Sequence, residues 1–325
     1  MLYPLKFNPI YKEKIWGGNK LKSILNKDCQ ENKNTGESWE LSAVQENISV
    51  VSNGFLAEND IEELIEVYMG DLVGEKVYEK FGLELPLLFK FIDAKEDLSI
   101  QVHPNDAFAK EKHKAYGKTE MWYVIDAEKD SKLTIGFNKE SDQAEFIQKI
   151  QSEDIQSILN IEEAHQEDVF LVPSGTVHSI GKGILLAEIQ QTSDISYRIH
   201  DYNRKEEDGN LRELHNEFAK DAINYSYEKK KRTDYKKEIN KPVLLSKCEY
   251  FTSNIISFNK EIERDYIDID SFVVYMCTEG EFFIDYQKGE PIKISKGETV
   301  LIPAALDMIA LIPSKNTTII ETYIN

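Results

Sequence analysis

The chain has 325 residues, 41% of them apolar and 30% charged, so it can bury a substantial core and form two domains. Its 39 basic and 58 acidic residues give a formal net charge of −19, which argues against non-specific binding to nucleic acid or to an anionic membrane. No apolar run approaches the roughly 20 residues of a membrane helix, and we expect no signal peptide. The three cysteines lack C-x-x-C spacing, which is typical of reduced thiols in a cytoplasmic protein.

The first hundred residues predict short strands followed by a helical region. Residues 3–25 begin as a strand and reach the W-G-G turn, residues 36–51 alternate like one or two strands, and Asn53-Gly54 marks a turn. Apolar residues at helical spacing then predict helices over 61–81, interrupted near Gly70 and Gly74. A short apolar run at 85–92 ends in a polar turn at 93–97.

The most informative stretch runs from residue 98 to residue 125. Gln101 and His103 are two apart in a predicted strand, so their side chains share one face. Residues 104–106 end that strand, 107–116 have helical character, and a glycine follows. Lys118 and Glu120 are again two apart where the next strand begins, and therefore also share a face.

These two pairs suggest a metal site. If both strands lie in one curved sheet, their side chains converge, and His178 in V-P-S-G-T-V-H can add a second imidazole. Two imidazoles and a carboxylate suit zinc or ferrous iron, and the Gln101 carbonyl could be a further neutral ligand. A lone histidine near a strand end is more often a surface residue, but the combination of Q-x-H, K-x-E and P-x-G-x-x-H favours a metal site.

The rest of the chain predicts more short strands, with helices at their edge, as in a β-sandwich or barrel. We expect strands at 131–137, 169–172, 183–190 and 195–199, and a helix over 141–159. Residues 228–241 include seven basic residues and almost no apolar ones, so we interpret them as a solvated linker. Several short strands between 243 and 323 then predict a second β domain.

The two halves share a pattern that suggests an internal repeat. Residues 168–178 align without gaps on residues 298–308, and Pro173 falls on Pro303. His178, however, falls on Met308. We infer two copies of one β-barrel module, of which only the first has kept its metal ligand.

Several motifs resemble one known family. Q-V-H-P-N-D (101–106), G-K-T-E-M-W (117–122) and V-P-S-G-T-V-H-S-I (172–180) resemble the metal-site motifs of the type I mannose-6-phosphate isomerases, a cupin-fold family. W-G-G (16–18), G-E-S-W-E-L-S (36–42) and S-D-I-S-Y-R-I-H-D-Y-N-R (193–204) resemble it in the same order. The likeness covers residues 3 to about 204 and continues more weakly to the end. Because the interval between Glu120 and His178 is short, the chain resembles the shorter bacterial members.

The resemblance implies a mainly β protein with helical insertions and two cupin-like, jelly-roll barrels. Residues 1–227 would be the catalytic domain, 228–241 the basic linker and 242–325 a degenerate barrel without metal ligands. One zinc ion per chain would be held by Gln101, His103, Glu120 and His178, with Lys118 and Arg198 as catalytic residues. For Lys118, a salt bridge to a neighbouring carboxylate is an equally good explanation.

The implied activity is the interconversion of mannose 6-phosphate and fructose 6-phosphate by zinc-assisted proton transfer through a cis-enediol(ate). Two alternatives stay open: an iron-dependent cupin oxygenase, and a non-catalytic, metal-stabilised sugar-binding or regulatory cupin. A fourth ligand at Gln101 argues against the oxygenase, and Lys118 and Arg198 argue against the binding protein. The expected partner is a small sugar phosphate. In so acidic a chain its phosphate needs a local cluster of Lys, Arg or backbone N–H groups, and the sequence leaves monomer or homodimer open.

Overall fold

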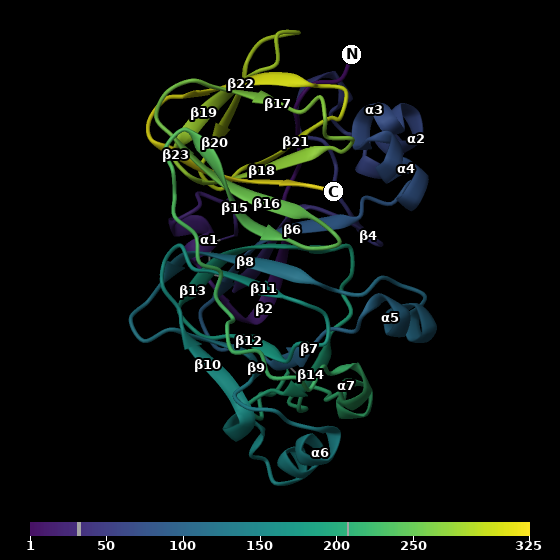
Figure 1. Ribbon diagram of the computed structural model, residues 1–325, viewed down its shortest axis with the longest axis vertical. Helices are drawn as coiled ribbons and strands as arrows, with labels where there is room; N and C mark the ends of the chain where they lie inside the picture. Colours follow the sequence, from purple (N-terminus) through teal and green to yellow (C-terminus); the bar gives the residue numbers. More distant parts are fainter. Residues whose placement is uncertain (31–33, 207) are drawn as a thin grey trace.

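The computed structural model describes residues 1–30, 34–206 and 208–325, and its strands form four stacked sheets (Figure 1). In spatial order, the first sheet contains β10 (Leu159–Glu163), β9 (Lys132–Phe137), β12 (His178–Ile180), β7 (Ile100–Val102) and β14 (Tyr197–His200). The second contains β11 (Val169–Val172), β8 (Glu120–Ala127), β13 (Ile184–Gln191), β6 (Leu87–Ala94), β2 (Ile10–Gly18) and β3 (Thr35–Leu41). These two sheets make the N-terminal half, so the mainly β class expected from the sequence is confirmed.

The other two sheets make the C-terminal half. The third contains β1 (Leu5–Lys6), β21 (Thr299–Ile302), β18 (Val273–Glu279), β23 (Thr317–Tyr323), β16 (Thr252–Phe258) and β15 (Lys241–Lys247). The fourth contains β17 (Ile262–Asp265), β22 (Met308–Pro313), β19 (Glu281–Asp285) and β20 (Ile292–Ser295). A small hairpin of β4 (Ala43–Val44) and β5 (Asn47–Ile48) lies outside these sheets.

The two halves have the same strand order. The run β11-β8-β13-β6 in the N-terminal half corresponds to β21-β18-β23-β16, and β10-β9-β12-β7 corresponds to β20-β19-β22-β17. His178 begins β12 and Met308 begins β22, as the alignment of the two segments requires. Two copies of one module would produce this order.

Short helices lie at the edges of the sheets (Figure 1). They are α1 (Lys20–Ser23), η1 (Gly54–Leu56), α2 (Ile61–Tyr68), α3 (Gly70–Val73), α4 (Glu75–Phe81), α5 (Asp106–His113), α6 (Gln143–Gln151), η2 (Ile155–Ile158) and α7 (Asn216–Ala222). The interruption expected near Gly74 is confirmed: its φ of +95° and the approach of the Asp270 backbone, 2.5 Å from an added Cβ, require glycine. No helix in the described ranges is long and apolar enough to cross a membrane.

The helix expected over residues 141–159 is shorter than its apolar spacing predicts. It ends at Gln151, and Leu159 already pairs with Phe137 as the first residue of β10. The apolar spacing favours a helix to the end of this segment, but pairing its last residues with β9 as a strand is more stable. Local periodicity cannot reveal such a distant strand partner.

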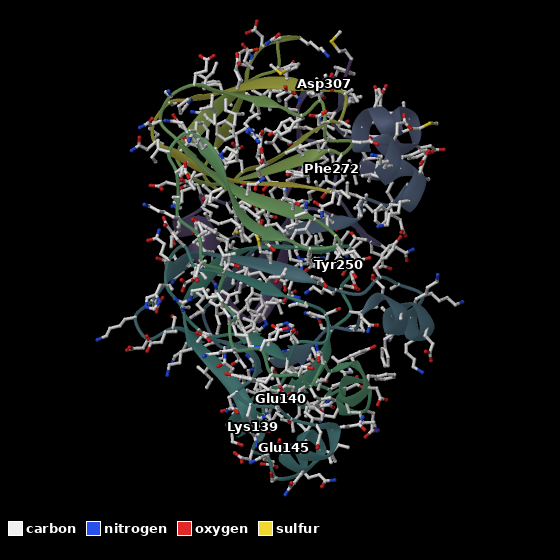
Figure 2. The ribbon with its side chains drawn as sticks, in the orientation of Figure 1. Lys139, Glu140, Glu145, Tyr250, Phe272 and Asp307 are labelled. Atoms are coloured by element: carbon white, nitrogen blue, oxygen red, sulfur yellow. The ribbon has the colours of Figure 1, made fainter. Side chains whose placement is uncertain are left out.

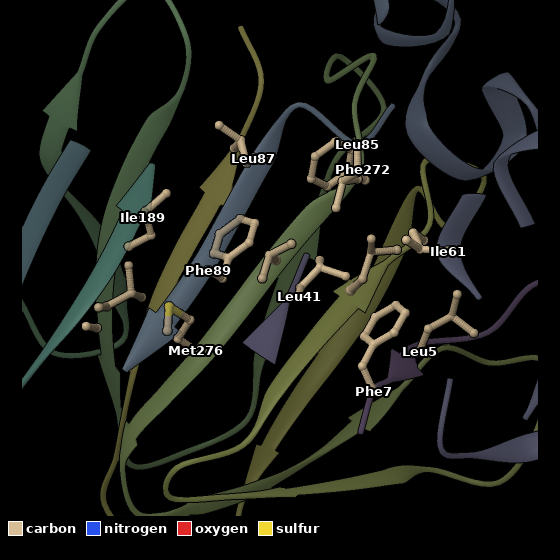
Figure 3. Packing of buried hydrophobic residues seen from close by; sticks show 14 of the residues in the cluster. Leu5, Phe7, Leu41, Ile61, Leu85, Leu87, Phe89, Ile189, Phe272 and Met276 are labelled. Atoms are coloured by element: carbon tan, nitrogen blue, oxygen red, sulfur yellow. The ribbon is translucent and has the colours of Figure 1, made fainter. Parts of the chain in front are cut away.

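The middle of the molecule is a core shared by both halves. All residues of β6 and β13 are buried, because each strand is covered on both faces. Figure 3 shows Leu41, Phe89 and Ile189 of the N-terminal half packed with Phe272 and Met276 of the C-terminal half. The N-terminal strand β1 also joins the third sheet by pairing with β21. The domain boundaries at 227 and 242 therefore stay predictions.

Most of the basic segment at residues 228–241 is exposed and none of it is buried, as its charge predicts, but its middle part contacts β11. Thr233 N donates to Val169 O at 2.8 Å. Arg232 lies 3.2 Å from Asp168 Oδ1, and Lys237 lies 2.6 Å from Glu167 Oε1. The segment covers the exposed edge of β11, and acidic residues beside that strand attract it.

Candidate metal centre

Three strands bring the expected ligands to one place between the first and second sheets. Gln101 lies in β7 and pairs in register with His178, the first residue of β12. His103 follows the end of β7, and Glu120 is the first residue of β8 in the facing sheet. Ligand atoms of His103, Glu120 and His178 lie within 4.8 Å of one another, and all three residues are buried. In the described part of the chain, this is the one such group of His, Cys, Asp or Glu.

The carboxylate lies between the two imidazoles. His178 Nε2 is 3.3 Å from Glu120 Oε1, and His103 Nε2 is 3.6 Å from Glu120 Oε2. The side-chain amide of Gln101 completes the group, with its Nε2 3.3 Å from His178 Nε2. Rotating that amide by half a turn would present its oxygen at the same position. The structure therefore brings these four side chains together.

Both imidazoles are held in the tautomer that a metal requires. His103 Nδ1 lies 2.9 Å from Ile195 O, and His178 Nδ1 lies 2.9 Å from Thr176 O. Because a carbonyl only accepts hydrogen bonds, each Nδ1 donates and each Nε2 lone pair faces Glu120. Burial, and then Lys118, hold the pKa of His103 well below its usual range. Burial also lowers the pKa of His178, although Glu120 opposes it.

The carboxylate lacks the hydrogen bonds that a buried charge normally has. Both oxygens of Glu120 are fully buried, and Oε1 has no hydrogen-bond donor among the described residues. The ammonium of Lys118 is 2.9 Å from Oε2 and also 3.1 Å from His103 Nε2. Because that one ammonium is shared between Oε2 and an imidazole, it leaves Oε1 without a donor, which is costly for a buried carboxylate. The donor set therefore fits a divalent metal ion.

Lys118 belongs to a row of buried charges across the second sheet. Glu188 Oε1 lies 3.3 Å from Lys90 Nζ and 3.8 Å from Lys118 Nζ. Trp122 Nε1 donates to the other oxygen of Glu188 at 2.9 Å. Burial alone would lower the pKa of Lys118, but Glu120 and Glu188 raise it, so it stays an ammonium. The salt bridge considered for Lys118 from the sequence is present.

Lys90 was not expected from the sequence, and Glu188 had no assigned role. Glu188 pairs with Lys90 and Lys118. A single charged residue in the otherwise apolar run L-L-F-K-F-I could have pointed to Lys90. Burial lowers its pKa, and the nearby Lys118 ammonium lowers it further.

Arg198 lies beside the metal centre without contacting its ligands. It pairs in register with Gln101 on the neighbouring strand, so the two side chains share a face. Its Nε is 3.3 Å from Ser99 Oγ, and its Nη1 donates to Glu213 O at 2.6 Å. Burial, and then the nearby Arg212, lower its pKa.

Two further arginines lie nearby: Arg212 contacts the same serine, and Arg204 contacts Asp201, to which Ser99 donates a hydrogen bond. Arg212 Nη1 lies 3.2 Å from Ser99 Oγ and 3.2 Å from Asp201 Oδ1. Arg204 also donates to Asp201 Oδ1. Three guanidinium groups and one buried carboxylate give this cluster a local positive charge in an acidic protein. Sequence reasoning assigned no role to Arg204 and did not consider Arg212.

Comparison with known proteins shows which family this chain resembles over nearly its whole length. Residues 4–149 match the family model for the catalytic domain of type I phosphomannose isomerase. The chain is 36% identical to the mannose-6-phosphate isomerase ManA of Bacillus subtilis over 93% of this chain and 94% of that protein. It is 39% identical to the mannose-6-phosphate isomerase of Streptococcus mutans, covering 69% and 68%. The crystal structure of the mannose 6-phosphate isomerase from Bacillus subtilis superposes with a TM-score of 0.88, at 32% identity over 99% of this chain and 100% of that one.

Proposed function

The chain belongs to the type I phosphomannose isomerase family, and on that premise we propose that it interconverts mannose 6-phosphate and fructose 6-phosphate at the centre of His103, Glu120 and His178. The observation that carries this proposal is the buried carboxylate of Glu120, which faces two imidazoles and has the Lys118 ammonium as its one described donor, on Oε2, while Oε1 has none. That arrangement suits a metal-dependent isomerase.

We infer that the cation is one zinc ion, held by His103, Glu120 and His178, with Gln101 as a fourth ligand. Imidazole and carboxylate suit zinc, and a single carboxylate leaves the metal with net positive charge. Bound there, the metal would supply Lewis-acid stabilisation of the negative charge that develops on the sugar oxygens. The cytoplasmic location expected from the sequence stays part of this proposal.

The protein's own residues would hold the open-chain sugar while a proton moves between C1 and C2. The Lys118 ammonium lies within reach of the metal ligands and can donate a hydrogen bond to an enediolate oxygen. Lys90 and Trp122 fix the Glu188 carboxylate beside it, and that carboxylate keeps Lys118 protonated. Burial of these charges excludes water from the reacting carbons.

We propose that the phosphate binds at the cluster of Arg198, Arg204 and Arg212 around Ser99. Guanidinium groups suit phosphate because they offer parallel N–H donors. The cluster lies one strand from Gln101, so a six-carbon chain could extend from it toward the metal. It also answers the need for a local positive site in a chain of net charge −19.

We propose that the C-terminal half carries no metal. In contrast to Glu120, its buried Glu321 accepts hydrogen bonds from Arg264 at 2.8 Å and from the Tyr266 hydroxyl at 2.6 Å. Asn254 donates to its other oxygen at 2.9 Å. A carboxylate satisfied in this way neither needs nor admits a cation.

The direct test is to assay the purified protein before chelation, after chelation and after zinc is added back. We expect conversion of mannose 6-phosphate to fructose 6-phosphate that is lost on chelation and restored by zinc. No conversion in a folded, zinc-loaded sample would overturn the proposed reaction. Full turnover in Lys118→Ala or Arg198→Ala would overturn their catalytic roles, with the exposed Lys139→Ala as the matched control.

A further inference from the structure

Asp106, the first residue of α5, lies three residues after His103 and accepts three hydrogen bonds. Its Oδ1 accepts from Gly117 N at 2.8 Å and from Gln191 Nε2 at 3.0 Å. Its Oδ2 accepts from the Tyr250 hydroxyl at 2.7 Å. One carboxylate therefore joins the segment that follows His103 to the segment that precedes Glu120.

The loop before Glu120 is fixed by the same network. Thr119 N donates to Gln191 Oε1 at 2.9 Å, and Gln191 N donates to Thr119 O at 3.2 Å. Lys118 N donates to Pro104 O at 3.1 Å. The backbone that carries Lys118 and Glu120 is thus held against the segment after His103, partly through Asp106. Any movement of Asp106 would change the separation of the two metal-ligand segments.

Tyr250 comes from the other half of the molecule. It lies in the turn between β15 and β16, and Figure 2 shows it at the boundary between the two halves. It is 144 residues from Asp106 in the sequence. Burial, and then the hydrogen bond to Asp106, raise the pKa of Tyr250, so its hydroxyl keeps the proton that it donates. Within the described ranges, it is the one donor to Asp106 Oδ2.

We propose that Tyr250 is a positioning residue for the metal centre: acting through Asp106, it ties the C-terminal half to the segments that carry His103 and Glu120. This inference rests on the proposed metal-dependent function. Without the hydroxyl, Asp106 Oδ2 has no donor and its carboxylate turns toward water, which loosens its hold on Gly117 and Gln191. The C-terminal half thereby contributes to metal binding without holding a metal.

The test compares zinc release from full-length Tyr250→Phe and wild-type protein, with each zinc-loaded sample mixed with a chromogenic chelator. We expect release to be roughly threefold to tenfold faster, below or at the low end of the ~10–100-fold effects of residues that contact a metal ligand directly. We also expect kcat to fall more than KM rises. Co²⁺-loaded Tyr250→Phe should show a shifted visible spectrum, because the ligand geometry relaxes.

The matched control is Tyr235→Phe. Tyr235 is also partly buried and donates one hydrogen bond, to Glu167 O at 2.6 Å. Glu167 precedes the start of β11, whereas the loop before Glu120 contacts Ser174, beyond the other end of that strand. We expect its zinc release and Co²⁺ spectrum to match those of the wild type. Equal release from Tyr250→Phe and Tyr235→Phe would overturn the positioning role.

Changing Asp106 tests the path itself. Asp106→Asn keeps Oδ1 for Gly117 and offers its amide group to the Tyr250 oxygen, so release should stay within about twofold of wild type. In an Asp106→Ala background, Tyr250→Phe should add nothing, because both changes break one connection. If the increases in zinc release rate from Tyr250→Phe and Asp106→Ala were additive, the proposed path through Asp106 would be wrong. A wild-type protein that binds no zinc would instead overturn the proposed metal centre, and the two failures are therefore distinguishable.

Discussion

Glu120 carries the only negative charge among the proposed metal ligands, and its Oε1 has no hydrogen-bond donor in the described structure. Glu120→Gln preserves its shape and removes that charge. We expect zinc affinity to fall at least ~100-fold, beyond the usual effect of residues outside the ligand set. Zinc content after dialysis against a weak chelator measures this.

The control for that change is Glu145→Gln. Glu145 pairs with the exposed Lys139 at the end of the molecule labelled in Figure 2, far from the metal centre. Its zinc content should equal that of the wild type. Retention of zinc by Glu120→Gln at the wild-type level would contradict the assigned ligand set.

Glu37, which interacts with Lys90 of the buried row of charges, makes stability depend on pH. Burial by itself would raise its pKa, but Lys90, Lys14 and the Trp39 indole outweigh burial and lower the pKa to about 2, from 4.5. The group's folded pKa is depressed, so its stabilisation is complete above about pH 4.5 and is lost as the pH falls toward 2. The contribution of the ionised Glu37 to the free energy of unfolding is on the order of 3 kcal/mol above that range.

Urea unfolding of metal-free wild-type and Glu37→Gln protein tests this dependence. The difference in free energy of unfolding should be largest at pH 7 and clearly smaller at pH 3. A difference that does not change between these pH values would show that Glu37 is not held ionised by its neighbours.

At the scale of single elements, contacts of Arg232 hold the middle of the basic segment at residues 228–241 against β11. The Arg232 guanidinium donates to Glu163 O at 2.6 Å, pairs with Asp168 and lies over the Phe170 ring. We expect Arg232→Ala to lower the free energy of unfolding by about 1–2 kcal/mol and to speed proteolysis within the segment. Urea unfolding and limited trypsin digestion measure the two effects.

Lys230→Ala is the control for this prediction. The Lys230 side chain is 64% exposed and pairs with an exposed aspartate, so the change should stay within about 0.5 kcal/mol of wild type. If Arg232→Ala also changed the free energy of unfolding by less than about 0.5 kcal/mol, the contacts of Arg232 would not stabilise the fold, and the segment would act only as a linker.

At the scale of the whole molecule, the shared core predicts that both halves unfold together. All three tryptophans, Trp16, Trp39 and Trp122, lie in the N-terminal half, whereas strands of both halves contribute to far-UV circular dichroism. The two signals of the metal-free protein should therefore follow one denaturation curve.

Phe89→Ala tests the same coupling by truncating a fully buried ring in the core between the halves. We expect the free energy of unfolding to fall by about 3–5 kcal/mol, and the fluorescence and circular dichroism curves to shift by the same amount. Phe55→Ala is the control: that residue is 66% exposed, so its truncation should change the free energy of unfolding only slightly. A shift in fluorescence alone would show that the halves unfold independently.

The sequence by itself determined what depends on short spacing. Residues two apart on a strand share a face, so Gln101 with His103 and Lys118 with Glu120 could be paired from their spacing alone. The mainly β class and the broken helices over 61–81 followed from local periodicity and glycine positions in the same way. The P-x-G-x-x-H pattern offered His178 as a second imidazole, although no periodicity links it to Gln101 and His103.

Contacts between segments that are distant in sequence became apparent only in the tertiary structure, because they depend on strand pairing and on packing. That structure brought Lys90 to Glu188 and Lys118, ended a helix where Leu159 pairs with Phe137, and laid the basic segment along β11. It also placed Tyr250 on Asp106 across 144 residues. Such contacts leave no local period in the sequence, because each depends on how two sheets stack and not on the residues beside it.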